Sequence, residues 1–261
     1  MLIVVSPAKS LDFESPLPTK KYTEPAMLDR SSELIGIMAA KTPAQIGQMM
    51  SISPSLAALN HERFQDWERP FTPKNARPAL LAFDGDVYDG MAARTTFTER
   101  DFTHAQKTLR ILSGLYGVLR PLDLMMAYRL EMGTKLANAR GRDLYAFWGD
   151  TITNTLRDDI AASPGSKVLI NLASTEYFGS VRPARIGVPV ISPVFLDPNR
   201  AGQQKIVSFF AKKARGAMSA WIIRERIATP KDLPSFDGLG YRFDAERSSV
   251  LQPVFVRDPV R

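Results

Sequence analysis

The stretch MLIVVSPAKSLDF (residues 1–13) decides how the fold starts. Leu2 to Val5 form a short apolar run closed by Ser6-Pro7, a pattern that predicts a buried strand. Lys9 follows almost at once, and groups that bind ligands often lie at the ends of strands in α/β folds. Lys9 is therefore a candidate for holding a phosphate or carboxylate. The stretch lacks the glycines of a Walker loop, and a turn with a solvated lysine is the alternative interpretation.

Helix and strand signals are interspersed along the rest of the chain. Helices are expected at about residues 24–41, 98–110, 148–162 and 205–227, with shorter ones starting at Thr42-Pro43 and Ser53-Pro54. Strands are expected at residues 79–83, 167–172, 188–196, where Pro193 indicates either an edge strand or a break, and 250–256. This predicts an α+β (mixed α/β) fold: one compact domain over residues 1–261, with helices around short mixed strands and a variable tail from about residue 246.

The composition excludes several classes of protein. With 261 residues and 44% hydrophobic residues, the chain can bury one core and is too apolar to be disordered. The absence of cysteine excludes disulfides, Cys-ligated zinc, iron–sulfur clusters and thiol nucleophiles. The two histidines, His61 and His104, fit no triad or metalloprotease pattern, and Asp86 with Asp89 is too small a set for a dedicated metal site. No metal and no cofactor are predicted, and any redox role is expected to be indirect.

The charge balance favours an anionic partner. Lys and Arg number 34 against 27 Asp and Glu, which gives a net charge of +7. No signal peptide is recognisable at residues 1–13, and no apolar run approaches the roughly 18 residues of a membrane span. A cytoplasmic location without membrane contact is therefore expected.

One stretch concentrates these charges. On a helix starting at Lys205, one side within about 80° contains cations and serines and no acid. Its members are Lys205, Ser208, Lys212, Arg215, Ser219 and Arg226. Like charges three residues apart repel unless an anion opposes them, so the stripe is a plausible surface for a phosphate backbone. A solvated face paired with acids elsewhere is the alternative. The other side, from Ile206 and Phe210 to Trp221, is expected in the core, and Gly216 indicates a close backbone approach.

The segment LRILSGLYGVLRPLDLMMAYRLEMG (residues 109–133) suggests a helix-hairpin-helix element. Gly114 and Gly117 would form the hairpin and offer backbone amides to a DNA phosphate. The surrounding cations are Arg110, Arg120 and Arg129. A helix C-cap followed by a loop explains Gly114 equally well.

A polar cluster follows the expected strand at residues 167–172. Asn171, Ser174 and Glu176 would orient a substrate, or Ser174 would simply cap a helix. Together with Lys9 and Asp86, these residues are weak catalytic candidates that would have to converge in one pocket. Arg129 would join them in that pocket, and it forms with Glu131 either a buried pair or a binding pair.

Five motifs together resemble a known family. They are SPAKSLDF (6–13), FDGDVYDG (83–90), LSGLYGVLRPLDLMMAYRLEMG (112–133), LINLASTEYF (169–178) and KKARGAM (212–218). The chain resembles the YaaA-type peroxide stress resistance proteins of bacteria from Met1 to about residue 245. The resemblance implies a cytosolic protein, induced by hydrogen peroxide, that limits intracellular iron and Fenton damage. It also implies binding of double-stranded DNA through a basic cleft with a helix-hairpin-helix element. It carries over no catalytic residue.

Two functional hypotheses follow. In the first, a non-enzymatic protein binds double-stranded or structured DNA through Lys205, Lys212, Lys213 and Arg215, with Arg110 and Arg120 flanking the hairpin at Gly114 to Gly117. In the second, an enzyme acts on a nucleic acid or a phosphorylated small molecule in a pocket around Lys9, Asp86, Asn171, Ser174 and Glu176. A protein-interaction module with an acidic partner is a third reading.

Overall fold

The computed structural model describes residues 1–199 and 202–258, which are organised around a five-stranded sheet of order β6-β5-β1-β8-β9. Strand β1 (Leu2–Val5) lies in the middle, parallel to β5 (Leu109–Ser113) on one side and β8 (Leu169–Leu172) on the other. Strand β9 (Val190–Ile191) is parallel to β8, and β6 (Gly117–Leu119) is antiparallel to β5. All four residues of β1 are buried, which confirms the predicted first strand.

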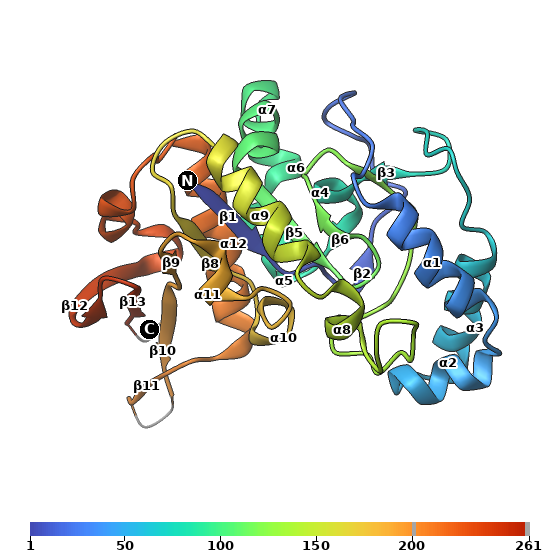
Figure 1. Ribbon diagram of the computed structural model, residues 1–261. Coiled ribbons are helices and arrows are strands. Elements are labelled where there is room, and N and C mark those ends of the chain that lie inside the picture. Colours follow the sequence, from blue (N-terminus) through green and yellow to red (C-terminus); the bar gives the residue numbers. More distant parts are fainter. Residues whose placement is uncertain (200–201, 259–261) are drawn as a thin grey trace.

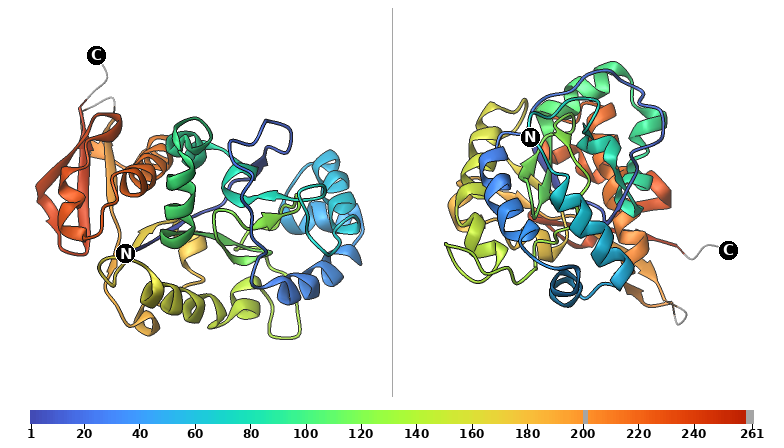
Figure 2. Two further views of the ribbon diagram at one scale, coloured as in Figure 1. Left: turned by 90° about the horizontal axis from the view of Figure 1, so that it is seen from above. Right: turned by 90° about the vertical axis from the view of Figure 1, so that its right-hand side faces the viewer.

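Helices cover both faces of this sheet, as Figures 1 and 2 show. Helix α9 (Thr151–Ala162) covers one face, and α7 (Glu99–Thr108) and α12 (Ser208–Arg224) cover the other. The buried apolar side chains include Ile152, Leu156 and Ile160 of α9 and Ala214, Met218 and Ile222 of α12. Their spacing of three to four residues places them on one side of each helix, facing the sheet.

The N-terminal helices form one end of the molecule. They are α1 (Leu28–Ala39), α2 (Pro43–Met50) and α3 (Pro54–Gln65). The predicted helix starts are confirmed, because the Thr42 and Ser53 side chains cap α2 and α3 with proline in the first turn. The other helical segments are α4 (Ala79–Ala82), α5 (Asp86–Met91), α6 (Ala93–Thr96), α8 (Leu144–Trp148), α10 (Thr175–Phe178), α11 (Pro183–Ile186), η1 (Pro230–Ser235) and η2 (Gly238–Gly240).

A second sheet forms the opposite end of the molecule (Figure 1). Its order is β11 (Gln204–Lys205), β10 (Val194–Pro198), β13 (Gln252–Arg257) and β12 (Tyr241–Ser249). The aromatic rings of Phe195, Phe236, Tyr241 and Phe255 pack together beneath it. Two small sheets pair β2 (Ser10–Leu11) with β4 (Phe83–Asp84) and β3 (Arg77–Pro78) with β7 (Leu124–Met125). Helices and mixed sheets in one fold confirm the α+β class.

Two predicted elements are corrected. The strand expected at residues 79–83 is helix α4 over Ala79–Ala82, and only Phe83 enters a strand. A short apolar run has no periodicity to separate a buried helical turn from a strand, and Ala and Leu favour the helix. The helix expected from Lys205 begins at Ser208, because Gln204 and Lys205 pair with β10 instead.

The end of α12 is tied to the start of α7 by a buried acid. Burial raises the pKa of the Asp101 carboxyl, but hydrogen bonds from the side chain and backbone of Thr98 and an ion pair with Arg226 outweigh it, so the pKa lies below its ordinary value. Such a group stabilises the fold above the unfolded pKa of about 3.9, and this contribution is lost as the pH falls through the lower folded pKa.

We expect Asp101→Asn to lower the free energy of unfolding by about 1–3 kcal/mol at pH 7, because Arg226 loses its charged partner and the hydrogen bonds from Thr98 reach a neutral oxygen in place of a carboxylate. Urea unfolding at pH 7 and at pH 3 measures the effect. The difference between the variant and the wild-type chain should shrink at pH 3. An equal difference at both pH values would contradict the charge-based account.

Candidate functional site

A cleft of about 550 Å³ opens at the carboxyl ends of β1 and β8. From these neighbouring strands the chain continues to opposite sides of the sheet, since β5 lies on the far side of β1 and β9 on the far side of β8. Ligands of open α/β sheets bind at such a switch point. The lining comes from Ser6–Ser10, Asp84–Val87, Glu131, Leu172 with Ser174, Glu176 and Tyr177, then Ile206, and Ser208, Ala211, Lys212 and Arg215 of α12.

Hydrogen bonds between the two strand ends shape the floor of the cleft. The Ser174 amide donates to Ser6 Oγ at 2.8 Å, and Ser6 Oγ donates to Ser174 Oγ at 3.2 Å. The Tyr88 hydroxyl donates to the Ser6 carbonyl at 3.1 Å. Ser174 also caps α10, which is the structural role that the sequence allowed for it. Ser6 begins the SPAKSLDF motif, but the sequence assigned it no role in a site, since only the pairing of β1 with β8 brings it to Ser174.

The residues proposed for an enzyme pocket largely converge. Lys9, Asp86, Ser174 and Glu176 all line this cleft. Asn171 does not line it: its side chain accepts from the Ala173 amide and donates to Ser192 Oγ, and so holds the backbone after β8. It is a supporting residue here.

Carboxylates of the cleft walls pair with two of its three cations. Lys9 lies 3.0 Å from Glu131, which also pairs with Arg129 at 3.2 Å. Lys212 lies 3.5 Å from Asp86. Arg129 and Glu131 thus form a half-buried pair with Glu131 at the cleft and Arg129 behind it.

Arg215 is the third cation of the cleft and differs from the other two. Its guanidinium makes no hydrogen bond or ion pair within residues 1–199 and 202–258. It is half-buried, and burial lowers the pKa of its guanidinium. A poorly hydrated cation without an acid partner is an anion receptor.

One lining phenol is fixed in its protonated form. Burial raises the pKa of Tyr177 well above its ordinary value, and nearby Tyr128, Glu176 and Glu131 raise it further. At neutral pH the Tyr177 hydroxyl is therefore a hydrogen-bond donor or acceptor and carries no charge.

Two glycines hold the cationic helix against the opposite wall. A Cβ on Gly216 of α12 would lie 1.8 Å from the Val87 carbonyl oxygen, and one on Gly90 of α5 would lie 2.1 Å from the Lys213 carbonyl oxygen. The close approach indicated by Gly216 is confirmed. It sets Asp86, at the start of α5, opposite Lys212.

The predicted cationic stripe is divided by the fold. Lys212 and Arg215 face the cleft, whereas Lys205 lies in β11 and Arg226 pairs with Asp101 beyond the helix. Lys213 stacks over the exposed Phe209 ring at 4.8 Å. The core prediction for the same segment is wrong at its start, where Ile206 is 57% exposed and lines the cleft.

The helix-hairpin-helix element suggested at residues 109–133 is not confirmed. These residues begin with β5 and β6, joined by a turn. A Cβ on Gly114 would lie 2.1 Å from the Leu130 carbonyl oxygen, and Gly117 has a left-handed φ of +68° beside the Trp148 ring. The glycines therefore serve a buried β-hairpin, in which a Cβ would meet the Leu130 backbone at Gly114 and the Trp148 ring at Gly117. A pair of helices joined by a short turn occurs instead at α2 and α3.

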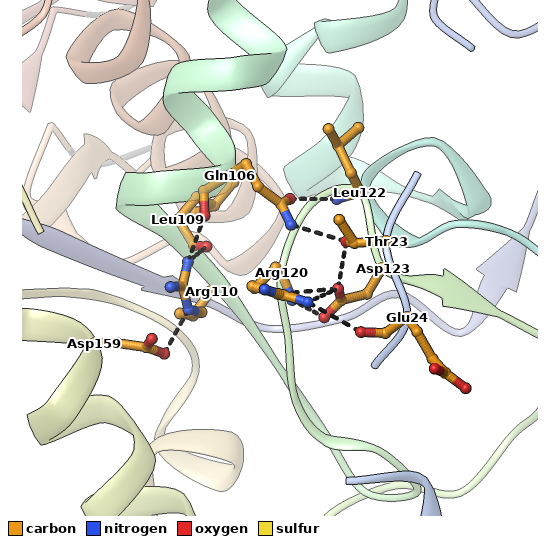
Figure 3. Close-up of polar contacts among 9 residues, drawn as sticks. All are labelled: Thr23, Glu24, Gln106, Leu109, Arg110, Arg120, Leu122, Asp123 and Asp159. Carbon is orange, nitrogen blue, oxygen red and sulfur yellow. Dashed lines mark hydrogen bonds and ion pairs between the residues drawn. The ribbon is translucent and has the colours of Figure 1, made fainter. Parts of the chain in front are cut away.

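The arginines beside that hairpin have partners inside the protein (Figure 3). Arg110 donates to Asp159 of α9 at 2.6 Å, and its side chain is only 6% exposed. Arg120 pairs with Asp123 at 2.9 Å and donates to the Glu24 carbonyl. An acid 49 residues along the chain thus holds the Arg110 side chain, and an acid three residues along holds that of Arg120.

Within the described ranges, no helix has the length and apolar composition needed to cross a membrane. A comparison with models of known protein families matches residues 1–247 to the family described as peroxide stress protein YaaA. The match includes every segment that lines the cleft. The chain belongs to the YaaA family of peroxide stress proteins.

Proposed function

We propose that this peroxide stress protein binds double-stranded or structured DNA through the cleft and the basic surface beside it. The observation that carries the proposal is the meeting of Lys9, Lys212 and Arg215, from two distant segments, in one cleft. Phosphate contacts by Lys and Arg supply most of the sequence-independent affinity of proteins for DNA.

Exposed residues next to the cleft lining in the sequence support the same proposal. Phe209 is 48% exposed, stacks on Lys213, and contacts the ring of Phe210. Exposed aromatic rings among cations are the surfaces on which unpaired bases stack, and so they suit DNA with unpaired nucleotides. Lys205 extends this basic surface along β11. In the proposal, DNA binding in the cytoplasm accompanies the limitation of iron and Fenton damage that the family resemblance implies.

The double variant Lys212→Glu with Arg215→Glu tests the proposal. We expect weaker duplex binding and a log–log salt slope reduced by about 0.9 for each lost phosphate contact. Fluorescence anisotropy of a labelled duplex at several salt concentrations measures both. The matched control is Lys231→Glu with Arg242→Glu, which makes the same change in net charge on exposed residues outside the cleft. Unchanged affinity, or an equal loss in both variants, would rule out the cleft as the DNA site.

A second candidate function is an enzyme acting on a nucleic acid or a phosphorylated small molecule. It is favoured by the convergence of Lys9, Asp86, Ser174 and Glu176, since DNA backbone binding alone requires no carboxylates. Incubation with plain, damaged and branched duplexes, with and without Mg²⁺, tests it. Covalent change of the DNA by the wild-type chain and not by Glu176→Gln supports an enzyme, whereas binding without change supports the first function.

A further inference from the structure

We propose that the cleft is a receptor for a single nucleotide, with the phosphate on Arg215 and the nucleoside against the apolar wall. This deepens the proposed function and rests on it, since the same cleft is assigned there to nucleic acid. Three observations carry it: the unpaired guanidinium, the composition of the wall, and the size of the cavity.

The guanidinium identifies the place of the phosphate. Lys9 and Lys212 already face Glu131 and Asp86, at 3.0 Å and 3.5 Å. Arg215 faces no acid within the described residues, although burial removes part of its hydration. Charged groups are rarely buried without a partner, so an anion on Arg215 completes the site. Arginine also matches the geometry of a phosphate through two parallel hydrogen bonds.

The wall of the cleft identifies the rest of the ligand. Its exposed apolar surface comes from Ile206, which is 57% exposed, and from the half-buried Tyr177, whereas the lining residues Val87, Leu172 and Ala211 are buried. A sugar phosphate has no apolar face and would leave the apolar surface of the cleft in contact with water. A nucleotide base has two apolar faces, and one of them can pack against that surface. Glu176 is exposed in the same cleft, and its carboxylate is an acceptor for base amino groups or sugar hydroxyls.

The size of the cleft determines how DNA enters. A volume of about 550 Å³ is within the usual range for a small-molecule site and far too small for a duplex. DNA therefore enters as one nucleotide, extruded from the helix or at a strand end, and extrusion is easiest at damaged or unpaired positions. A free nucleotide offers the same chemistry, so the test separates the two sources.

The first arm of the test uses free ligands. Calorimetry measures binding of the four deoxynucleoside monophosphates, the deoxynucleosides and inorganic phosphate. We expect the monophosphates to bind more tightly than either part alone. Arg215→Met should weaken their binding by about tenfold to a hundredfold, because a charge-assisted pair is lost. Lys231→Met, an exposed lysine outside the cleft and outside the basic surface beside it, should change it less than twofold.

A second variant separates recognition of the nucleoside from that of the phosphate. Ile206→Ala removes an exposed wall side chain, so folding is preserved, and we expect weaker monophosphate binding with unchanged phosphate binding. The inference is overturned if no monophosphate binds, if Arg215→Met binds as well as the wild type, or if phosphate alone binds as tightly as the monophosphates.

The second arm uses a duplex with 2-aminopurine opposite a mismatch. A rise in its fluorescence with the wild-type chain, absent with Arg215→Met, supports an extruded nucleotide. Binding of free monophosphates without that rise overturns extrusion and supports a free nucleotide as ligand. If the protein binds the duplex but binds no monophosphate, the nucleotide receptor is ruled out. The proposed DNA binding is then unaffected.

Discussion

Arg110→Met is expected to lower the free energy of unfolding by about 3 kcal/mol, because the buried Arg110 side chain is removed from an ion pair with the half-buried Asp159. The Arg110 guanidinium donates to Asp159 at 2.6 Å and also to the carbonyls of Gln106 and Leu109 at the end of α7 (Figure 3). The variant leaves the carboxylate without its cation and the last carbonyls of a helix without donors. Arg110 connects α7 and α9, which lie on opposite faces of the central sheet, and the variant removes this connection.

Urea unfolding measures this effect, with Arg157→Met as the matched control on α9. Arg157 is 51% exposed and pairs with its neighbour Asp158 at 3.5 Å, so its loss should change the free energy by less than about 0.5 kcal/mol. The double variant Arg110→Met with Asp159→Leu should recover part of the stability. Full stability of Arg110→Met together with weakened duplex binding would instead make Arg110 a DNA contact.

Gly216→Ala is expected to destabilise the protein by about 3 kcal/mol and to weaken ligand binding in the cleft. The new Cβ would lie 1.8 Å from the Val87 carbonyl oxygen and 2.7 Å from the Met91 amide nitrogen, so α5 and α12 must separate. Overpacking of this kind costs about 1–3 kcal/mol, and more where the obstructing atoms are backbone. The separation also moves Lys212 away from Asp86, which lies 3.5 Å from it.

Gly36→Ala is the control for the same chemical change. Gly36 lies within α1, and among the described residues nothing apart from its chain neighbours and its own helix backbone lies within 4 Å of a Cβ built on it. Alanine is favoured over glycine in a helix by up to about 1 kcal/mol, so this variant should be slightly more stable than the wild type. Thermal unfolding of the two variants should therefore shift in opposite directions. A neutral Gly216→Ala would show that the helices are not in close contact.

Local structure was largely predictable from the sequence. The buried run at Leu2 to Val5, the capped starts at Thr42, Ser53 and Thr98, and the break at Pro193 each depend on neighbouring residues. The prediction failed at Ala79–Ala82, where a short buried run is compatible with either structure, and at the Gly114–Gly117 hairpin, where glycine spacing alone did not distinguish a strand turn from a helix turn.

The sequence predicted which residues have the chemistry of a site, but it did not predict how those residues are arranged in space. The sequence alone identified Lys9, Asp86, Ser174, Glu176 and the cations of 205–226 as chemically active groups. It placed them in two competing hypotheses, yet the cleft contains members of both. The reason is that strand order and helix packing join segments far apart in the chain, and no local pattern encodes that pairing.

By itself, therefore, the sequence determined the first strand, the capped helices, the close approach at Gly216, the lack of thiol chemistry and the resemblance to the peroxide stress family. Only the tertiary structure decided which cations are available to a ligand. Arg110 and Arg120 are held by acids inside the protein, and Arg215 faces the cleft without one. The sequence does not show whether an arginine is paired. Its role depends on whether the fold places a carboxylate within ion-pair distance of its guanidinium.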